Sequence, residues 1–183
     1  MNELILDVET TISSKGNPFD ERNRLCYVGL YNNTLCDLVD IDYSGSPYRE
    51  RLDAIQRLID SHSTLVGFNI KFDLHWIRNY GINFMDKRIW DCQLAHFILT
   101  GQQNPYPSLN GVADFYALGS KLDIIATDYW KNGIDTDQIP KEFDFLVSFL
   151  PDYPAGPHTE IEHEQIASFM DVLKELQSRE RKY

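Results

Sequence analysis

Two carboxylates spaced two residues apart, Asp7 and Glu9, are the first residues of this sequence that could perform chemistry. Asp7 lies within a short apolar run, Leu4–Val8, that predicts a buried β-strand, and Glu9 follows directly. Side chains two residues apart in a strand point to the same face, so these carboxylates would project together. Adjacent anions repel each other, and a hard divalent cation with oxygen ligands is their natural partner. Taken alone, such a pair is more often a solvated strand end.

A third carboxylate, Asp73, follows a second apolar run. The strand-like segment Thr64–Phe68 leads into a predicted helix over Lys71–Asn79, which places Asp73 in the first turns. A later segment repeats this arrangement at Asp91. Because Asp91 stands at the start of its predicted helix, we interpret it as a structural cap of free backbone N–H groups.

The remaining elements must position these carboxylates. Residues 25–30 and 35–41 flank Asn32–Asn33 and predict a β-hairpin, whereas the polar segment 10–23 predicts a loop. Further helices are predicted over residues 47–60, 91–99, 108–116, 138–150 and 160–181. Strands therefore come first and helices dominate later, which indicates an α/β fold with a mixed sheet flanked by helices. The length of 183 residues favours one domain.

Composition limits the class of protein. A hydrophobic content of 43% supports a packed core and argues against general disorder. The amino-terminal residues lack a cationic start, and no apolar stretch is long enough for a membrane span, so we expect neither a signal peptide nor a membrane partner. Three cysteines without a CxxC pair favour buried thiols in a reducing, cytoplasmic setting.

The net charge of −11 restricts how the chain could contact nucleic acid. A long track along nucleic acid requires a basic surface, which this composition does not favour. Contact would instead be local, at a strand end, with metal ions neutralising the phosphate. The same acidity fits a protein-binding module with no role on nucleic acid.

The ordered series of motifs resembles the DEDD 3′→5′ exonucleases, the ribonuclease-H-like proofreading family. Residues 7–10 are similar to the first motif of that family, and residues 67–73 are similar to its second motif. The longer stretch 67–101 is similar to the proofreading domain of DNA polymerase I. Residues 108–113 and 133–140 resemble phage polymerases of the same family.

The resemblance covers residues 1–150 and implies a ribonuclease-H-like mixed sheet. Residues 151–183 would then be a divergent connector and terminal helix of a single domain spanning residues 1–183, with no polymerase domain. We therefore expect the exonuclease to act alone or beside a separately encoded DNA polymerase, for example in a phage-infected bacterial cytoplasm.

The family chemistry gives each motif residue a role. The resemblance implies two Mg²⁺ or Mn²⁺ ions that clamp the scissile phosphate. Asp7 would bridge both ions, Glu9 would bind the water-activating ion, and Asp73 would bind the second. Asn69 and Phe72 would line the pocket that binds the nucleic-acid strand end, although a core position is the alternative for Phe72.

The family also carries a fourth carboxylate on a late helix, with a Tyr four residues or a His five residues before it to orient the attacking water. We choose Asp171, which lies within a predicted helix, as catalytic residue and metal ligand. Asp152 is the alternative, but prolines on both sides exclude a regular helix there. Neither aspartate has a Tyr or His at the family spacing. Glu162, Glu164 or no residue could take the position instead.

The sequence therefore predicts a metal-dependent 3′→5′ exonuclease that hydrolyses phosphodiester bonds at the 3′ ends of single-stranded DNA, in proofreading or DNA degradation. Two alternatives stay open. One is a catalytically weak exonuclease fold that serves as an acidic binding module for a polymerase or another replication or host protein. The other is a ribonuclease that acts on short RNAs through the same site.

Overall fold

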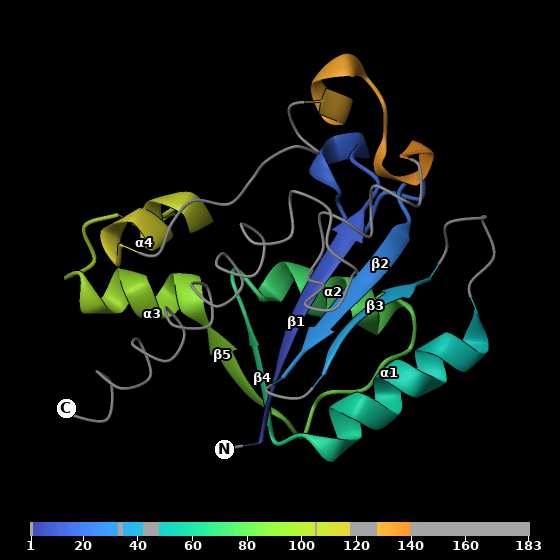
Figure 1. Cartoon of the computed structure of the whole chain (residues 1–183), viewed down its shortest axis with the longest axis horizontal. Helices are drawn as coiled ribbons and strands as arrows, with labels where there is room; N and C mark the ends of the chain where they lie inside the picture. The colour runs from blue at the N-terminus through green and yellow to red at the C-terminus, as the bar shows by residue number, and fades with distance from the viewer. Residues whose placement is uncertain (1, 33–34, 42–47, 105, 118–127, 140–183) are drawn as a thin grey trace, which may run out of the picture.

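A five-stranded sheet forms the centre of the computed structural model, which describes residues 2–32, 35–41, 48–104, 106–117 and 128–139 (Figure 1). Its strands are β1 (Glu3–Thr10), β2 (Leu25–Tyr31), β3 (Cys36–Asp40), β4 (Thr64–Gly67) and β5 (Arg88–Asp91). The spatial order is β3-β2-β1-β4-β5. β2 is antiparallel to β1 and β3, whereas β4 is parallel to β1 and β5 is parallel to β4. The predicted mixed sheet and hairpin are confirmed.

Among the described residues, four α-helices accompany the sheet, and each coincides with a predicted helix. They are α1 (Arg49–Ser61), α2 (Lys71–Asn79), α3 (Cys92–Leu99) and α4 (Leu109–Phe115). Short 3-10 helices are η1 (Ser13–Lys15), η3 (Trp130–Asn132) and η4 (Thr136–Gln138). The helix predicted over 138–150 lies outside the described residues except for its first two, and Gln138 ends η4 instead. The helix predicted over 160–181 lies wholly outside them.

The larger core lies between the sheet and helices α1 and α2. α1 supplies Ile55 and Ile59, and α2 supplies Trp76 and Ile77, all at most 2% exposed. These positions recur at helical spacing, so each helix buries one face. Burial of an aliphatic side chain contributes roughly 1.5–3 kcal/mol, which makes this cluster the main source of stability among the described elements.

A smaller cluster lies on the opposite face of the sheet, where α3 and α4 pack beside each other (Figure 1). Its buried members are Ile5, Val66, Cys92 and Val112. The thiols of Cys26 and Cys92 are free and buried, as predicted. Burial raises the pKa of the Cys92 thiol above its usual range, so the thiol stays protonated.

β5 is the one described strand that the sequence did not predict. Its four residues lie at the sheet edge and run from exposed to half-buried, so they lack the apolar run that marks a buried strand.

None of the described helices has the length and apolar character that a membrane crossing requires.

Candidate active site

Successive side chains of β1 point to opposite faces of the sheet, so Asp7 and Glu9 lie on the same face. Leu4, Leu6 and Val8 enter the larger core, whereas Ile5 enters the smaller cluster on the other face. Asp7 and Glu9 share the parity of Ile5, and both are half-buried. The predicted projection of the two carboxylates to one face is thereby confirmed. The pairing of β1 with β2 shifts register between Glu9 and Thr10, an irregularity that is frequent beside active sites.

The neighbouring strand β4 ends early and leaves part of β1 uncovered. β4 pairs with β1 only as far as Ile5, which lies opposite Val66. At Gly67 the chain turns so tightly that a Cβ atom would lie 2.9 Å from Ile70 Cγ1 and 3.0 Å from the Leu6 carbonyl oxygen. A glycine is required because a backbone oxygen at that distance cannot move aside without shifting β1. The chain therefore enters α2 directly beside the carboxylate end of β1.

Asp73 lies beside the part of β1 that does not pair with β4. It lies in the first turn of α2, is 3% exposed, and accepts a hydrogen bond from the Val8 backbone N–H at 3.0 Å. Burial raises the pKa of the Asp73 carboxyl well above its usual range, and the negative charges of Asp7 and Glu9 raise it further. The structure thus brings the three predicted carboxylates close enough to interact electrostatically.

The donor set has a clear chemical preference. Carboxylates that repel one another in a partly buried position are the oxygen donors that a hard divalent cation prefers. Within the described part of the chain, no group of three His, Cys, Asp or Glu side chains has the geometry to hold a metal ion. The predicted fourth ligand, Asp171, and its alternatives Asp152, Glu162 and Glu164 lie outside the described residues.

The other predicted site residues lie at the junction of β4 and α2. Asn69 is exposed and adopts the left-handed backbone conformation with a φ of 55°, which asparagine tolerates better than most residues. Its N–H donates to Asp91 Oδ1 at 3.0 Å. Phe72 is half-buried and packs against the larger core. Its predicted contact with nucleic acid stays a prediction.

Asp91 acts as the predicted helix cap. Its Oδ1 accepts from the backbone N–H of Gln93 at 2.9 Å and of Leu94 at 3.4 Å, which satisfies free donors in the first turn of α3. The structural interpretation is confirmed. The same oxygen also binds the Asn69 N–H, so one carboxylate links the start of α3 to the turn before α2.

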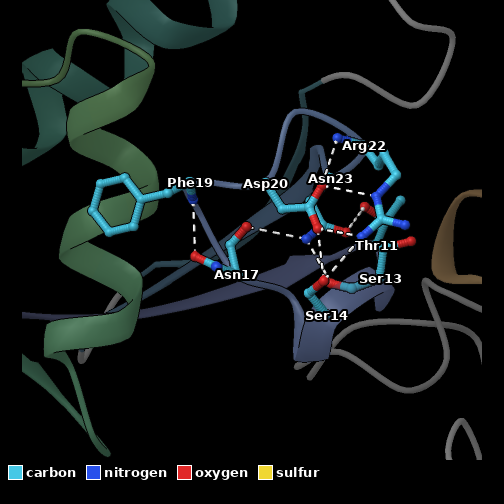
Figure 2. Close-up of polar contacts among 8 residues, drawn as sticks. All are labelled: Thr11, Ser13, Ser14, Asn17, Phe19, Asp20, Arg22 and Asn23. Atoms are coloured by element: carbon cyan, nitrogen blue, oxygen red, sulfur yellow. Dashed lines mark hydrogen bonds and ion pairs between the residues drawn. The ribbon is translucent and has the colours of Figure 1, made fainter.

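The β1–β2 loop, residues 11–24, is a hydrogen-bonded element that the sequence described only as a polar loop. Thr11 Oγ1 donates to Asn23 Oδ1 at 3.1 Å. Asn23 Nδ2 donates to the carbonyl oxygens of Ser13 at 2.6 Å and Asn17 at 3.0 Å (Figure 2). Asparagine and threonine favour such side-chain bonds to backbone, but the sequence does not identify their partners.

An exposed ion pair links Arg22 and Asp20 within the same loop. Arg22 Nη2 lies 2.6 Å from Asp20 Oδ2, and Ser14 Oγ donates to that oxygen, also at 2.6 Å (Figure 2). These donors hold the pKa of the Asp20 carboxyl below its usual range, with Arg22 as the largest cause.

Distant segments anchor the loop beside the carboxylates. Trp76 Nε1 of α2 donates to the Gly16 carbonyl oxygen at 3.0 Å. The Ile12 N–H donates to Oδ1 of Asp135, the residue before η4, at 2.9 Å, and Arg24 forms an ion pair with Asp137 of η4. Residues 133–139, the described part of the segment that resembles phage polymerases, thus pack against the loop that follows the first motif, close to the end of β1 (Figure 1).

Solved structures provide the first comparison. A structure described as the apo form of the nuclease aligns with a TM-score of 0.59 and 14% identity, over 97% of this chain and 72% of the other. Brucella melitensis NrnC with bound Mg²⁺ aligns with a TM-score of 0.58 and 16% identity, over 99% and 74%. The family B DNA polymerase from Pyrobaculum calidifontis aligns with a TM-score of 0.55 and 11% identity, over 93% and 24%. At these identities the likeness shows the fold.

Sequence comparisons supply the family. A search of curated proteins gives no match. A family model described as 3′-5′ exonuclease, of the DNA polymerase A type, matches residues 1–140 of the 183. That match covers both motif segments, the β1–β2 loop and η4. The ribonuclease-H-like fold predicted from the sequence agrees with it. The chain therefore belongs to the 3′-5′ exonuclease family of the DNA polymerase A type, and its fold is that of a nuclease.

Proposed function

We propose that this protein is a metal-dependent 3′→5′ exonuclease that hydrolyses phosphodiester bonds at the 3′ ends of single-stranded DNA. The proposal is supported mainly by the position of Asp7, Glu9 and Asp73, which lie close enough to interact electrostatically beside the end of β1. The chain also belongs to the exonuclease family. We propose the whole chain, residues 1–183, as one exonuclease domain.

Asp7, Glu9 and Asp73 would hold the metal ions, and we propose Mg²⁺ or Mn²⁺ in a two-ion site. The Mg²⁺ bound to a protein of the same fold supports this assignment. Bound ions would supply the positive charge that stabilises a reacting phosphate and lowers the pKa of an attacking water. The Val8 N–H fixes one oxygen of Asp73, so this ligand is oriented before any ion binds. Asp171 remains our candidate for the fourth ligand.

The substrate assignment follows from charge and from position. With a net charge of −11, the chain favours contact at a strand end over contact along a duplex. Asn69 is exposed on the turn before α2, and Phe72 lies one residue before Asp73, which supports our proposal that both contact a terminal nucleotide. The shared fold with a family B DNA polymerase supports proofreading beside a separately encoded polymerase.

A single labelled substrate tests the proposal. Purified protein is incubated with a single-stranded DNA oligonucleotide labelled at its 5′ end, in Mg²⁺, Mn²⁺ or EDTA. Removal of mononucleotides from the 3′ end gives a ladder of shortening labelled products only when metal is present. Asp7→Ala should abolish the ladder, whereas Asp114→Ala, an exposed acid on α4, should retain it. Activity that survives Asp7→Ala would show that the assigned site is wrong.

A protein-binding role is the second candidate. The net charge of −11 favours it, and so does the irregular third motif, in which neither Asp171 nor Asp152 has a Tyr or His at the family spacing. Calorimetric titration with Mn²⁺ separates the two functions, because an exonuclease must bind the ion. An absence of metal binding, together with tight binding to a polymerase, would favour the binding module. An RNA oligonucleotide of the same sequence tests the ribonuclease alternative in the same assay.

A further inference from the structure

The β1–β2 loop, which follows the strand that carries Asp7 and Glu9, presents an exposed aromatic ring. Phe19 is 72% exposed, and its ring lies edge-on against His75 of α2 with centroids 5.5 Å apart. Figure 2 shows this ring pointing away from the polar network of the loop, toward a helix. Single exposed aromatic residues are common on protein surfaces, so exposure alone assigns no role. The way in which the loop holds this ring is more informative.

The backbone before Phe19 is strained and firmly held. Ser14, Lys15 and Gly16 adopt left-handed conformations in succession, with φ values of 48°, 60° and 68°. Such conformations cost free energy for residues with a side chain and persist only where surrounding contacts enforce them. Asn23 and Trp76, both buried, use their side-chain N–H groups to hold carbonyl oxygens on either side of Lys15. The loop is therefore preorganised.

The same turn contacts both motif segments. A Cβ atom on Gly16 would lie 2.7 Å from Thr10 Oγ1 and 3.3 Å from Phe72 Cζ. Thr10 follows Glu9 in the sequence, and Phe72 precedes Asp73. The turn therefore packs against the sequence neighbours of two of the three carboxylates. Three residues of chain reach at most about 10 Å, so the Phe19 backbone lies within roughly three stacked nucleotides of Gly16.

Further contacts fix the position of Phe19. Its N–H donates to Asn17 Oδ1 at 3.0 Å, and Asn79 Nδ2 of α2 donates to the Pro18 carbonyl oxygen at 2.7 Å. These bonds fix the backbone at Pro18 and Phe19, so the backbone that carries the ring loses little freedom when the ring binds a ligand.

A cation on the same turn complements the ring. Lys15 is exposed, and its side chain forms no ion pair with another described residue. In a chain with a net charge of −11, a cation beside the acidic site offers local attraction to phosphate. An aromatic ring and a basic side chain on a rigid turn are the combination that binds single strands without sequence preference.

We infer that Phe19 stacks on a base of the single strand whose 3′ end enters the carboxylate site, and that Lys15 contacts the phosphodiester backbone of that strand. The inference rests on the proposed function, because it assigns the path of the same substrate. Phe19 and Lys15 are positioning residues that lie upstream of the reacting phosphate.

Binding without cleavage tests the inference. Anisotropy of a fluorescent 12-nucleotide single strand is measured with the Asp7→Ala protein, and a dinucleotide competitor measures affinity for the strand end alone. Adding Phe19→Ala should weaken 12-nucleotide binding roughly 5- to 150-fold, the range for loss of one base–aromatic stack. Dinucleotide affinity should stay the same if, as inferred, the ring stacks on a base upstream of the terminal nucleotides. Phe19→Tyr should restore binding.

Two further variants sharpen the result. Phe115→Ala is the matched control, because Phe115 is 61% exposed and lies edge-on against His96 at 5.0 Å, but on α4. It should leave both affinities unchanged. Lys15→Gln should reduce the slope of log Kd against log salt concentration by about 0.7, the contribution of one phosphate contact on a single strand.

Three outcomes would overturn the inference. They are no measurable binding by the Asp7→Ala protein, unchanged 12-nucleotide binding in Phe19→Ala, and an equal loss for both ligands, which would indicate a structural effect. A failure of the proposed function appears separately, as an absence of metal-dependent products from the otherwise unaltered protein.

Discussion

The two faces of the central sheet receive different residues from the same strand. Toward α1 and α2, β1 presents Leu4, Leu6 and Val8, which join the larger core. Toward the opposite face it presents Ile5 and then the half-buried Asp7 and Glu9, beside the smaller described cluster. One face therefore buries apolar side chains, and the other carries the candidate catalytic carboxylates. The stability of the first face can offset the repulsion among carboxylates on the second.

Asp73 connects the two faces. It belongs to α2, whose Trp76 and Ile77 pack in the larger core, yet its carboxyl reaches the edge of β1. The rigid packing of α2 thus fixes the position of an acid that repels its neighbours. The comparison implies that substitutions near the carboxylates reduce activity, whereas substitutions in the larger core reduce stability.

The largest expected effect is on activity, in Asp73→Asn. The amide can still accept from the Val8 N–H, but it removes the negative charge that a metal ion would need. We expect kcat/KM to fall by roughly 10³-fold, because metal-ion stabilisation of the transition state is worth several kcal/mol. Without metal, the melting temperature should stay equal or rise, since repulsion with Asp7 and Glu9 is relieved. An Mg²⁺-induced increase in melting temperature as large as in the parent would contradict a ligand role.

Two neighbouring residues of β1 compare the faces directly. Leu6, 1% exposed, lies in the larger core, and Ile5, 6% exposed, lies in the smaller cluster. Large-to-small substitutions in cores cost roughly 2–5 kcal/mol, and the cost grows with the cavity that remains. Urea unfolding followed by circular dichroism should place Leu6→Ala near the upper end of this range and Ile5→Ala near the lower. The reverse order would mean that the larger cluster is not the main source of stability.

The third prediction concerns the β1–β2 loop, which contacts Thr10 and Phe72, the sequence neighbours of Glu9 and Asp73. Asn23→Ala leaves the carbonyl oxygens of Ser13 and Asn17 without their donor, which should lower the free energy of unfolding by about 1–3 kcal/mol. It should also reduce activity, because the loop packs beside Thr10 and Phe72. Arg22→Ala removes only an exposed ion pair of the same loop and should change both quantities less. Equal effects of the two variants would show that the buried network does not hold the loop.

The smallest expected effect is a pH dependence on the α3–α4 side. Burial lowers the pKa of His96, which is 6% exposed and packs against Phe115 and Tyr116. The unfolded chain therefore binds the proton more readily than the native protein, so His96 reduces stability as pH falls below about 6.5. Melting temperatures at pH 7.5 and 5 should fall less in His96→Gln than in the parent. An identical fall in both would rule out this contribution.

Most regular elements could be predicted because their signals are local. The apolar run at Leu4–Val8 and the helical spacing over Lys71–Asn79 each lie within one element, and the structure has both. The role of Asp91 as a helix cap could also be predicted, because a cap accepts hydrogen bonds from N–H groups only two and three residues away. β5 could not be predicted, because an exposed edge strand has no apolar run.

The sequence by itself determined that Asp7 and Glu9 share one face of a strand, because alternation is a property of the strand alone. It also placed Asp73 in the first turns of a helix. Only the tertiary structure decided that Asp73 is buried against the Val8 N–H, 65 residues away, where the early end of β4 leaves β1 uncovered. Only the tertiary structure showed that Asn23 and Trp76 hold a strained turn beside these acids. Such bonds depend on how distant segments pack, and no local pattern encodes the distance between them.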